Sequence, residues 1–339
     1  MRTRLPFSTT LLRLRSECIA QVTRYFGENG FTQTHTPIIT SSDCEGAGQV
    51  FNVGTRADVI GGKYDDTFFK SPKYLTVSSQ LHLEALAQSV GKVWTLSPTF
   101  RAEKSDTARH LSEFYMLEAE LSFVEDMNSV MDIVENMIVH ITKALKASPF
   151  LNELSSNKNP DLESDEQGRS GVIRSRWENI LGGPWRRITY TEAIDHLQHD
   201  ALKSLTPFIS APEWGMGLQA QHERYLTETL SQGSPLFVTR YPKLIKPFYM
   251  LSSPTNAQDG QETVECFDLL FPEALEIVGG SMREHRLEPL LQSMQEKGML
   301  APGNVSAVHE EELVSLAKFS LPFSRSQEHS LALNTSHII

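Results

Sequence analysis

Two stretches of alternating polarity, residues 92–101 and 114–123, constrain the fold most strongly, because only a polar loop of residues 102–112 separates them. Strands joined by one loop pair antiparallel, so this region predicts a hairpin with a long, charged tip. Elsewhere helical and extended patterns are intermixed, with no regular alternation of strand and helix and no internal repeat. An α+β fold, an antiparallel β-sheet flanked by helices, is therefore favoured over a doubly wound parallel sheet.

Composition excludes several classes of protein. The 42 acidic and 31 basic residues give a net charge of −11, which disfavours a general electrostatic grip on nucleic-acid phosphates. The most apolar long stretch, residues 127–146, contains Asp132, Glu135 and Lys143, so we expect no membrane span. The cysteines lack CxxC spacing, which argues against a disulfide scaffold or a cysteine zinc site; they are Cys18, Cys44 and Cys266.

Apolar residues at helical spacing predict helices over residues 11–26 and 130–145. Further helices are expected over residues 79–90, 191–202 and 220–230, and further strands over residues 31–40, 74–77, 236–239, 248–252, 263–271 and 275–282. The polar composition of residues 151–183 predicts a surface insertion or a linker. No Walker GxxxxGK[ST] and no GxGxxG motif occurs, so ATP would be bound by another device.

The tip of the predicted hairpin carries charges suited to a nucleotide. Arg101 and Glu103 share one face of a strand, and Arg109 and His110 follow in the loop. A guanidinium holds a phosphate, and a carboxylate accepts from an amino group. An exposed ion pair across the strands explains Arg101 and Glu103 equally well.

Four acidic residues are predicted on the sheet. Glu118 and Glu120 share one side of their strand, and Asp268 and Glu276 face each other if the later turn is centred on Pro272. Carboxylates gathered on one face need cations, and Mg²⁺ with a polyphosphate supplies them. Solvated carboxylates on a wet face are the alternative.

Other candidate residues carry weaker signals. Gly279 and Gly280 precede Arg283 and allow close approach of the backbone, although a turn explains them as well. A different function, that of a metal hydrolase, would use His196 and His199, which lie three residues apart on a predicted helix. A solvated helix end explains these histidines better.

Several segments, in this order, resemble class II aminoacyl-tRNA synthetases, and most closely the asparaginyl enzymes. They are Asp43 to Gly48, Ser78-Ser79-Gln80-Leu81, Phe100-Arg101-Ala102-Glu103, Glu113-Phe114-Tyr115-Met116-Leu117-Glu118, Arg187 to Ala193, His222 to Leu226, Tyr241 to Met250 and Gly279 to Arg283. The resemblance extends from about residue 11 to about residue 300.

The resemblance implies an antiparallel sheet flanked by helices and a homodimer built on the first helix and the strand that ends at Pro37. It also implies a reaction, in which asparagine attacks the α-phosphorus of ATP to give asparaginyl-adenylate and pyrophosphate. The terminal ribose of tRNA(Asn) then takes the asparaginyl group.

Site residues are implied by position. Arg101 and Glu103 would be catalytic and bind the α-phosphate and the adenine side of ATP, with Arg109, His110 and Glu276 as further ATP ligands. Asp268 and Glu276 would hold Mg²⁺. Glu45, Ser78 and Gln80 would surround the substrate ammonium. Arg283 would contact the oxygen, and Glu118 the nitrogen, of the asparagine amide.

The choice between asparagine and aspartate has a physical argument. Related aspartyl enzymes carry a lysine where this sequence has Leu83, and an absent cation favours a neutral amide over a carboxylate. Glu118 would accept from the amide and repel a carboxylate. Asparagine–tRNA ligase is therefore the predicted function, and an aspartyl enzyme is an alternative.

The sequence also departs from the family. The third motif, Gly-x-Gly-x-x-Arg, is expected shortly after residue 300 but is absent, and the only later arginine is Arg325. We therefore expect a catalytic core of residues 1–300, truncated at its C-terminal end, and an unrelated, poorly ordered tail of residues 301–339, with an uncovered edge in the sheet. Because the resemblance begins almost at Met1, we also expect the N-terminal anticodon-binding barrel of the family to be missing. A non-catalytic relic that dimerises or binds a ligand is the second alternative.

The predicted compartment is the mitochondrion. Four arginines, Arg2, Arg4, Arg13 and Arg15, precede the first acidic residue, as in mitochondrial transit peptides. Lys246-Pro247-Phe248 resembles organellar family members. The start of an amphipathic helix explains the arginines equally well, so a cytoplasmic protein is the alternative.

Overall fold

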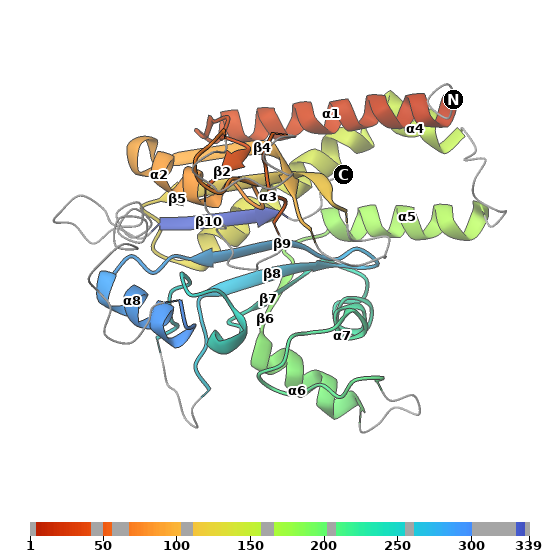
Figure 1. Ribbon diagram of the computed structural model, residues 1–339. Coiled ribbons are helices and arrows are strands. Elements are labelled where there is room, and N and C mark those ends of the chain that lie inside the picture. Colours follow the sequence, from red (N-terminus) through yellow and green to blue (C-terminus); the bar gives the residue numbers. More distant parts are fainter. Residues whose placement is uncertain are drawn as a thin grey trace. The chain divides into compact units, whose positions relative to one another are not determined.

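The computed structural model (Figure 1) describes residues 5–41, 50–55, 68–102, 111–156, 166–201, 208–254, 261–299 and 330–335. The chain divides into two units, which are described separately. Unit 1 comprises Met1–Phe31, Asp126–Ile245 and Phe267–Ile277, and unit 2 comprises Thr32–Glu125, Lys246–Cys266 and Val278–Ile339.

Unit 1 is mainly helical. Its helices are α1 (Pro6–Glu28), α3 (Met127–Lys146), α4 (Pro149–Ser156), α5 (Glu166–Leu181), α6 (Tyr190–Ala201) and α7 (Ala220–Tyr225), with a π-helical turn at Leu226–Leu230 and a 3-10 turn at Lys243–Ile245. Its strands are β6 (Arg186–Thr189), β7 (Leu236–Thr239) and β8 (Cys266–Phe271), in which β6 pairs parallel with β7 and β7 antiparallel with β8. Trp185 packs on Phe237 and Phe271 in the core.

Local chemistry fixes the helices of unit 1. The Asp126 carboxylate accepts a hydrogen bond from the Ser129 N–H at 3.0 Å and so caps the start of α3. The Tyr25 hydroxyl of α1 donates to the Ile133 carbonyl of α3 at 3.0 Å, and Thr10 of α1 donates to Glu153 of α4 at 2.8 Å. These bonds hold α1 beside α3 and α4.

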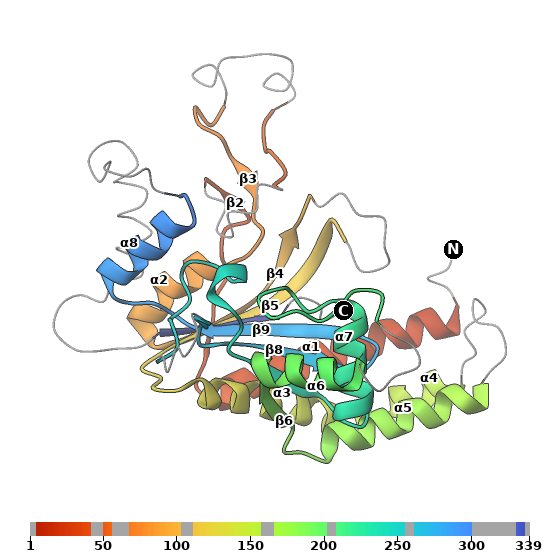
Figure 2. The same cartoon turned by 90° about the horizontal axis from the view of Figure 1, so that it is seen from below.

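Unit 2 is built on a sheet with the strand order β1-β4-β5-β10-β9. The strands are β1 (Thr32–Gln33), β4 (Lys92–Phe100), β5 (Glu113–Ser122), β9 (Leu275–Met282, which begins in unit 1) and β10 (Ser330–Thr335). A smaller pair, β2 (Ile39–Thr40) and β3 (Tyr74–Leu75), stands apart from this sheet (Figure 2). The helices are α2 (Gln80–Val90) and α8 (Leu287–Glu296).

The predicted hairpin is confirmed. β4 and β5 pair antiparallel, with Thr95 opposite Glu118 and Val93 opposite Glu120. The predicted helices over residues 11–26, 79–90, 130–145 and 191–202 are confirmed as α1, α2, α3 and α6. The sheet of unit 2 is mixed, however, because β1 pairs parallel with β4. β1 contains only two residues, which is too short for its direction to be read from sequence.

The sequence predicted an uncovered edge in the sheet, and this prediction is wrong for β5 and β9. β10, formed by residues of the C-terminal segment, pairs antiparallel with both strands. Residues 151–183 were predicted as an insertion or linker, but the described part of this segment contains most of α4 and all of α5. Residues 248–252 form only isolated bridges, through Met250 and Ser252. Among the described residues, no helix is long and apolar enough to cross a membrane.

Candidate active site

Glu118 is buried at the start of α2. Its carboxylate accepts hydrogen bonds from the Ser78 hydroxyl at 2.5 Å and from the Ser79 N–H at 2.8 and 3.0 Å. The N-terminus of a helix supplies N–H groups and a positive dipole end, so a carboxylate is stabilised there. The sequence predicted that Glu118 shares a face with Glu120; the structure adds that both are almost fully buried.

Gln80 begins α2 and links two parts of the site. Its N–H donates to the Ser78 hydroxyl oxygen at 3.0 Å, and its side-chain amide donates to Glu84 at 3.0 Å. Glu84 lies one turn later on the same face of the helix, where side chains four residues apart meet. Ser78, Gln80 and Glu118 therefore form one connected cluster of side chains with Glu84.

Arg283 follows β9 and is buried among three polar partners and one ring. Its Nε lies 3.2 Å from Glu84 Oε1, its Nη2 lies 3.8 Å from Glu120 Oε2, and its Nη1 donates to the Ser281 hydroxyl at 3.3 Å. The guanidinium carbon lies 4.4 Å from the centre of the Tyr249 ring. Such a stacked, paired guanidinium has one preferred orientation.

Burial perturbs the charges of this cluster. Desolvation raises the pKa of Glu120 well above its usual value, although the charge of Arg283 acts in the opposite direction. Burial alone would lower the pKa of Arg283, but the charges of Glu120 and Glu84 outweigh it and raise that pKa. Perturbed charges of this kind, gathered in one place, mark candidate functional sites.

Arg101 lies just after β4 in the same unit. Its guanidinium carbon is 5.6 Å from the centre of the Phe114 ring, and its backbone N–H donates to the Ser112 carbonyl at 3.2 Å. The first contact is within the range of a cation–π interaction, so the side chain is partly held by its own hairpin. Four further candidates, Glu45, Glu103, Arg109 and His110, lie outside the described residues.

Asp268 and Glu276 belong to unit 1. Asp268 is buried in β8, opposite Val238 of β7, whereas Glu276 is an exposed residue of β9. The turn between their strands occupies residues 272–274, so its centre is Glu273 and not Pro272. The condition under which these two carboxylates would face each other is therefore not met. Their assignment as Mg²⁺ ligands stays a prediction.

Three residues of the cluster had no assigned role in the sequence prediction: Glu84, Glu120 and Tyr249. For Glu84 a signal existed, since it lies four residues after Gln80 on a predicted helix. Glu120 was placed on the correct strand face, but alternation alone cannot distinguish a wet face from a buried one. The contact between Tyr249 and Arg283 depends on tertiary structure, so no sequence pattern indicated it.

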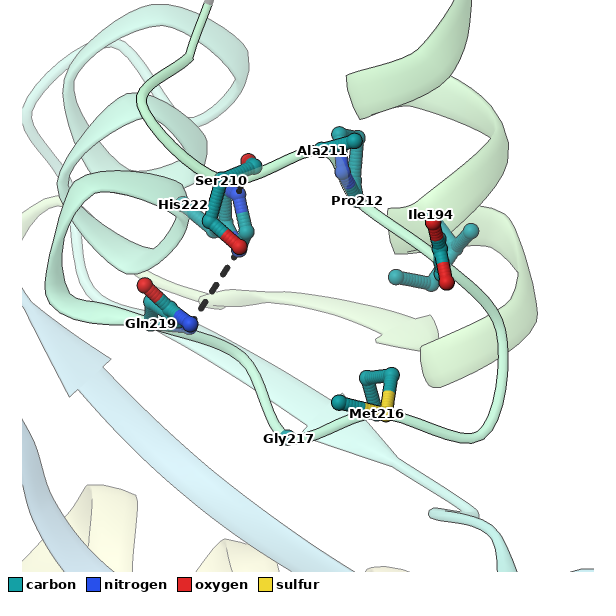
Figure 3. A pocket seen from close by; sticks show the side chains of 9 residues that line it. Ile194, Ser210, Ala211, Pro212, Met216, Gly217, Gln219 and His222 are labelled. Atoms are coloured by element: carbon teal, nitrogen blue, oxygen red, sulfur yellow. Dashed lines mark hydrogen bonds between the residues drawn. The ribbon is translucent and has the colours of Figure 1, made fainter.

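The other candidate sites in unit 1 have weaker support than the cluster around Arg283. Figure 3 shows a pocket of about 130 Å³ beside α6, where His222 Nδ1 accepts from the Gln219 N–H and Nε2 donates to the Ser210 carbonyl. This volume is below the roughly 300–1,000 Å³ of ordinary ligand pockets. Within the described part of the chain, no group of three or more His, Cys, Asp or Glu residues is arranged to hold a metal ion.

Comparison with known proteins agrees with the resemblance seen in the sequence. Residues 1–323 match the family model described as tRNA synthetases class II (D, K and N). The mitochondrial asparagine–tRNA ligase of Saccharomyces cerevisiae is 41% identical over 335 residues, which cover 96% of this chain and 66% of the yeast protein. The mitochondrial asparagine–tRNA ligase of Schizosaccharomyces pombe is 40% identical, over 85% of this chain and 58% of its own length.

A solved structure gives the same result for the fold. Asparaginyl-tRNA synthetase from Pyrococcus horikoshii, complexed with asparaginyl-adenylate, matches with a TM-score of 0.74 and 29% identity. The match covers 98% of this chain and 65% of that protein, so the chain spans less than two thirds of the length of these relatives. The fold, the ordered motifs and the family match agree, and the chain belongs to the class II tRNA synthetases of the D, K and N group.

Proposed function

We propose that this chain binds asparagine and ATP, forms asparaginyl-adenylate, and acts as the catalytic part of an asparagine–tRNA ligase. The observation that carries the proposal is the buried pairing of Arg283 with two glutamates beside the Glu118 carboxylate. A guanidinium donates to an amide oxygen and a carboxylate accepts from an amide nitrogen, so the two groups together complement a neutral amide.

Discrimination against aspartate follows from charge. Leu83, where an aspartyl enzyme carries a lysine, packs with Ala87 and Val93 in an apolar core. An aspartate side chain would bring a further negative charge to a cluster that already contains three buried glutamates, Glu84, Glu118 and Glu120. Like charges in a low-dielectric interior repel strongly, and the amide avoids this cost.

ATP would be held by residues carried over from the family pattern. Arg101 would contact the α-phosphate and Glu103 the adenine side, with Arg109 and His110 toward the outer phosphates. By the same carry-over, Asp268 and Glu276 would provide hard oxygen ligands of the kind that Mg²⁺ prefers, and the ion would neutralise the phosphates of ATP. Glu45, Ser78 and Gln80 would surround the substrate ammonium. Catalysis then consists mainly of positioning and of stabilising charge at the phosphorus.

The proposal also covers the second substrate, the assembly and the compartment of the protein. Asparagine–tRNA ligases act on tRNA by name, so tRNA(Asn) is the proposed second substrate. A homodimer through α1 and the strand that ends before Pro37 is the proposed assembly. Two of the relatives are named as mitochondrial, which together with Arg2, Arg4, Arg13 and Arg15 supports a mitochondrial location.

The test is exchange of pyrophosphate into ATP, measured with asparagine and, separately, with aspartate. We expect exchange that depends on asparagine, and a kcat/KM for aspartate at least about 100-fold lower, because one unpaired buried charge is worth several kcal/mol. Equal exchange with aspartate would favour the aspartyl alternative. Asparagine binding without exchange would instead identify a non-catalytic relic.

A further inference from the structure

Glu84 of α2 is a buried carboxylate to which the family resemblance assigned no role. Only 5% of the residue is exposed, and its Oε1 contacts both the Gln80 amide at 3.0 Å and Arg283 Nε at 3.2 Å. A glutamate is almost never this buried unless it is paired. Glu84 therefore joins the start of α2, where Gln80 lies, to the guanidinium that follows β9.

Glu84 lies within ion-pair distance of Nε, the nitrogen that joins the guanidinium of Arg283 to its alkyl stem. Arg283 Nε faces Glu84, Nη1 donates to Ser281, Nη2 lies toward Glu120, and the ring of Tyr249 covers one face. A bound guanidinium loses side-chain entropy, and neighbours that fix its plane in advance reduce that cost when a ligand binds. Of these neighbours, Glu84 makes the shortest charged contact.

The charge of Glu84 has a second effect. Glu84 and Glu120 lie 3.2 and 3.8 Å from nitrogens of the Arg283 guanidinium, the charge of Glu118 acts on Glu120, and all three glutamates are buried. Glu118 is already stabilised by Ser78 and Ser79 at the helix start. Glu84 instead shares Arg283 with Glu120, so it offsets the positive charge that an acidic ligand would seek.

We propose that Glu84 is a positioning residue for Arg283, and that its charge makes the site select a neutral amide over a carboxylate. The inference rests on the proposed function, because it concerns the side chain of the same substrate. Glu84 acts through the guanidinium; it need not touch the substrate.

The experiment measures the affinity of the whole chain for asparagine and for aspartate by isothermal titration calorimetry. In Glu84→Gln the amide keeps the size of the side chain and removes its charge. We expect asparagine affinity to fall about tenfold and the preference over aspartate to narrow by a further factor of about ten, because a close, buried charge pair contributes at least about one such factor. KM for ATP is expected to change less than about twofold in the exchange assay, since Glu84 is not among the residues proposed to bind ATP.

Two comparisons separate positioning from a structural role. In an Arg283→Lys background, the added Glu84→Gln change should alter asparagine affinity by less than about twofold, because the guanidinium through which Glu84 acts is gone. Glu288→Gln, the same change at an exposed position of α8, is the matched control and should leave both affinities unchanged. Thermal melting checks that each variant is folded.

If Glu84→Gln fails to fold, Glu84→Asp replaces it. This variant keeps the charge but shortens the reach, so we expect weaker asparagine binding with the preference over aspartate retained. Unchanged preference and affinity in Glu84→Gln, or an equal loss with and without Arg283, would overturn the inference while the proposed function stands. A wild-type chain that binds no asparagine would overturn the proposed function, and this inference with it.

Discussion

Two arginines, each held between two carboxylates, occupy opposite environments in the two units. The side chain of Arg283 in unit 2 is 6% exposed, and the side chains of its partners Glu84 and Glu120 are 7% and 0% exposed. Arg187 of unit 1 is 26% exposed and contacts Asp132 and Glu135, which are 59% and 12% exposed. The same arrangement, an arginine between two carboxylates, therefore lies in a dry interior at Arg283 and at a more exposed position at Arg187.

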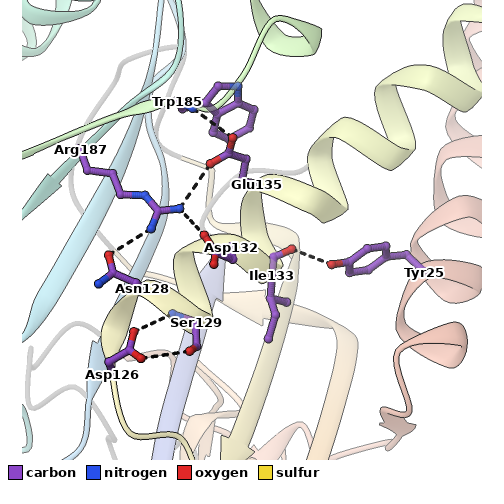
Figure 4. A network of polar contacts seen from close by, with 9 residues as sticks. All are labelled: Tyr25, Asp126, Asn128, Ser129, Asp132, Ile133, Glu135, Trp185 and Arg187. Atoms are coloured by element: carbon purple, nitrogen blue, oxygen red, sulfur yellow. Dashed lines mark hydrogen bonds and ion pairs between the residues drawn. The ribbon is translucent and has the colours of Figure 1, made fainter.

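The hydrogen bonds differ as much as the burial. Figure 4 shows Arg187 donating to Asn128 at 3.0 Å and to Asp132 at 2.5 Å, with Glu135 at 3.4 Å. Glu120 is the opposite case: among the described residues neither of its oxygens accepts a hydrogen bond, and its nearest cation is 3.8 Å away. A satisfied surface network holds β6 to α3. A buried carboxylate that is paired but poorly hydrogen-bonded costs stability, and such a cost is retained most often where a ligand binds.

The largest expected effect comes from removing the buried guanidinium. Arg283→Met keeps the bulk of the side chain but removes the cation from beside the buried side chains of Glu84 and Glu120. We expect the free energy of unfolding to fall by about 3–5 kcal/mol, measured by urea denaturation near neutral pH. Arg283→Lys keeps a positive charge and should lose less. A loss below about 1 kcal/mol in Arg283→Met would be no larger than the loss expected for a surface ion pair. It would contradict the expected difference between the buried and the exposed arginine.

A smaller effect should appear as a dependence on pH. The pKa of Glu120 in the folded chain lies well above the ordinary value of a glutamate, because burial disfavours the charged form. The folded state then binds more protons than the unfolded state between these two pKa values. The stability that Glu120 contributes is therefore fully present at low pH and is lost as the pH rises through this window.

Glu120→Gln removes that dependence. Relative to the variant, the wild-type chain should lose up to about 1.4 kcal/mol of unfolding free energy per pH unit above the ordinary glutamate pKa. Urea denaturation of both proteins between about pH 5 and pH 8 measures the difference. Curves that stay parallel across this range would show that Glu120 is ionised and stabilised in the folded state.

How much of the fold the sequence predicts depends on the length of each pattern. β4, β5 and α3 are long and strongly periodic, so their existence and pairing were predicted correctly. β6 has four residues and β10 six, and both form because neighbouring strands accept them. α5 has little apolar periodicity, and polar contacts of Asn179 with the Gly233 carbonyl attach it instead. Such elements depend on tertiary partners that no local pattern reveals.

The site divides in the same way. Ser78, Gln80, Glu118 and Arg283 were identified from motifs, and the structure joins them through a residue that no motif contained, Glu84. Glu118 and Arg283 are 165 positions apart in the sequence. The residues that lie beside Glu118 and Arg283 depend on which faces of β5, β9 and α2 are buried by other parts of the chain. A sequence pattern shows which residues share a face, but it does not show which face is buried.

The smallest expected effect concerns Arg187, the more exposed of the two arginines compared above. Arg187→Met removes three polar contacts but leaves carboxylates that water can reach, so we expect a loss of about 1 kcal/mol in unfolding free energy. The loss should shrink between about 0.1 and 1 M salt, because screening weakens exposed pairs and barely affects buried ones. Arg224→Met, the same change at an exposed position of α7, is the control. Since Arg187 acts only within unit 1, asparagine affinity should not change; a loss near that of Arg283→Met, independent of salt, would show that exposure does not decide what such a pair contributes.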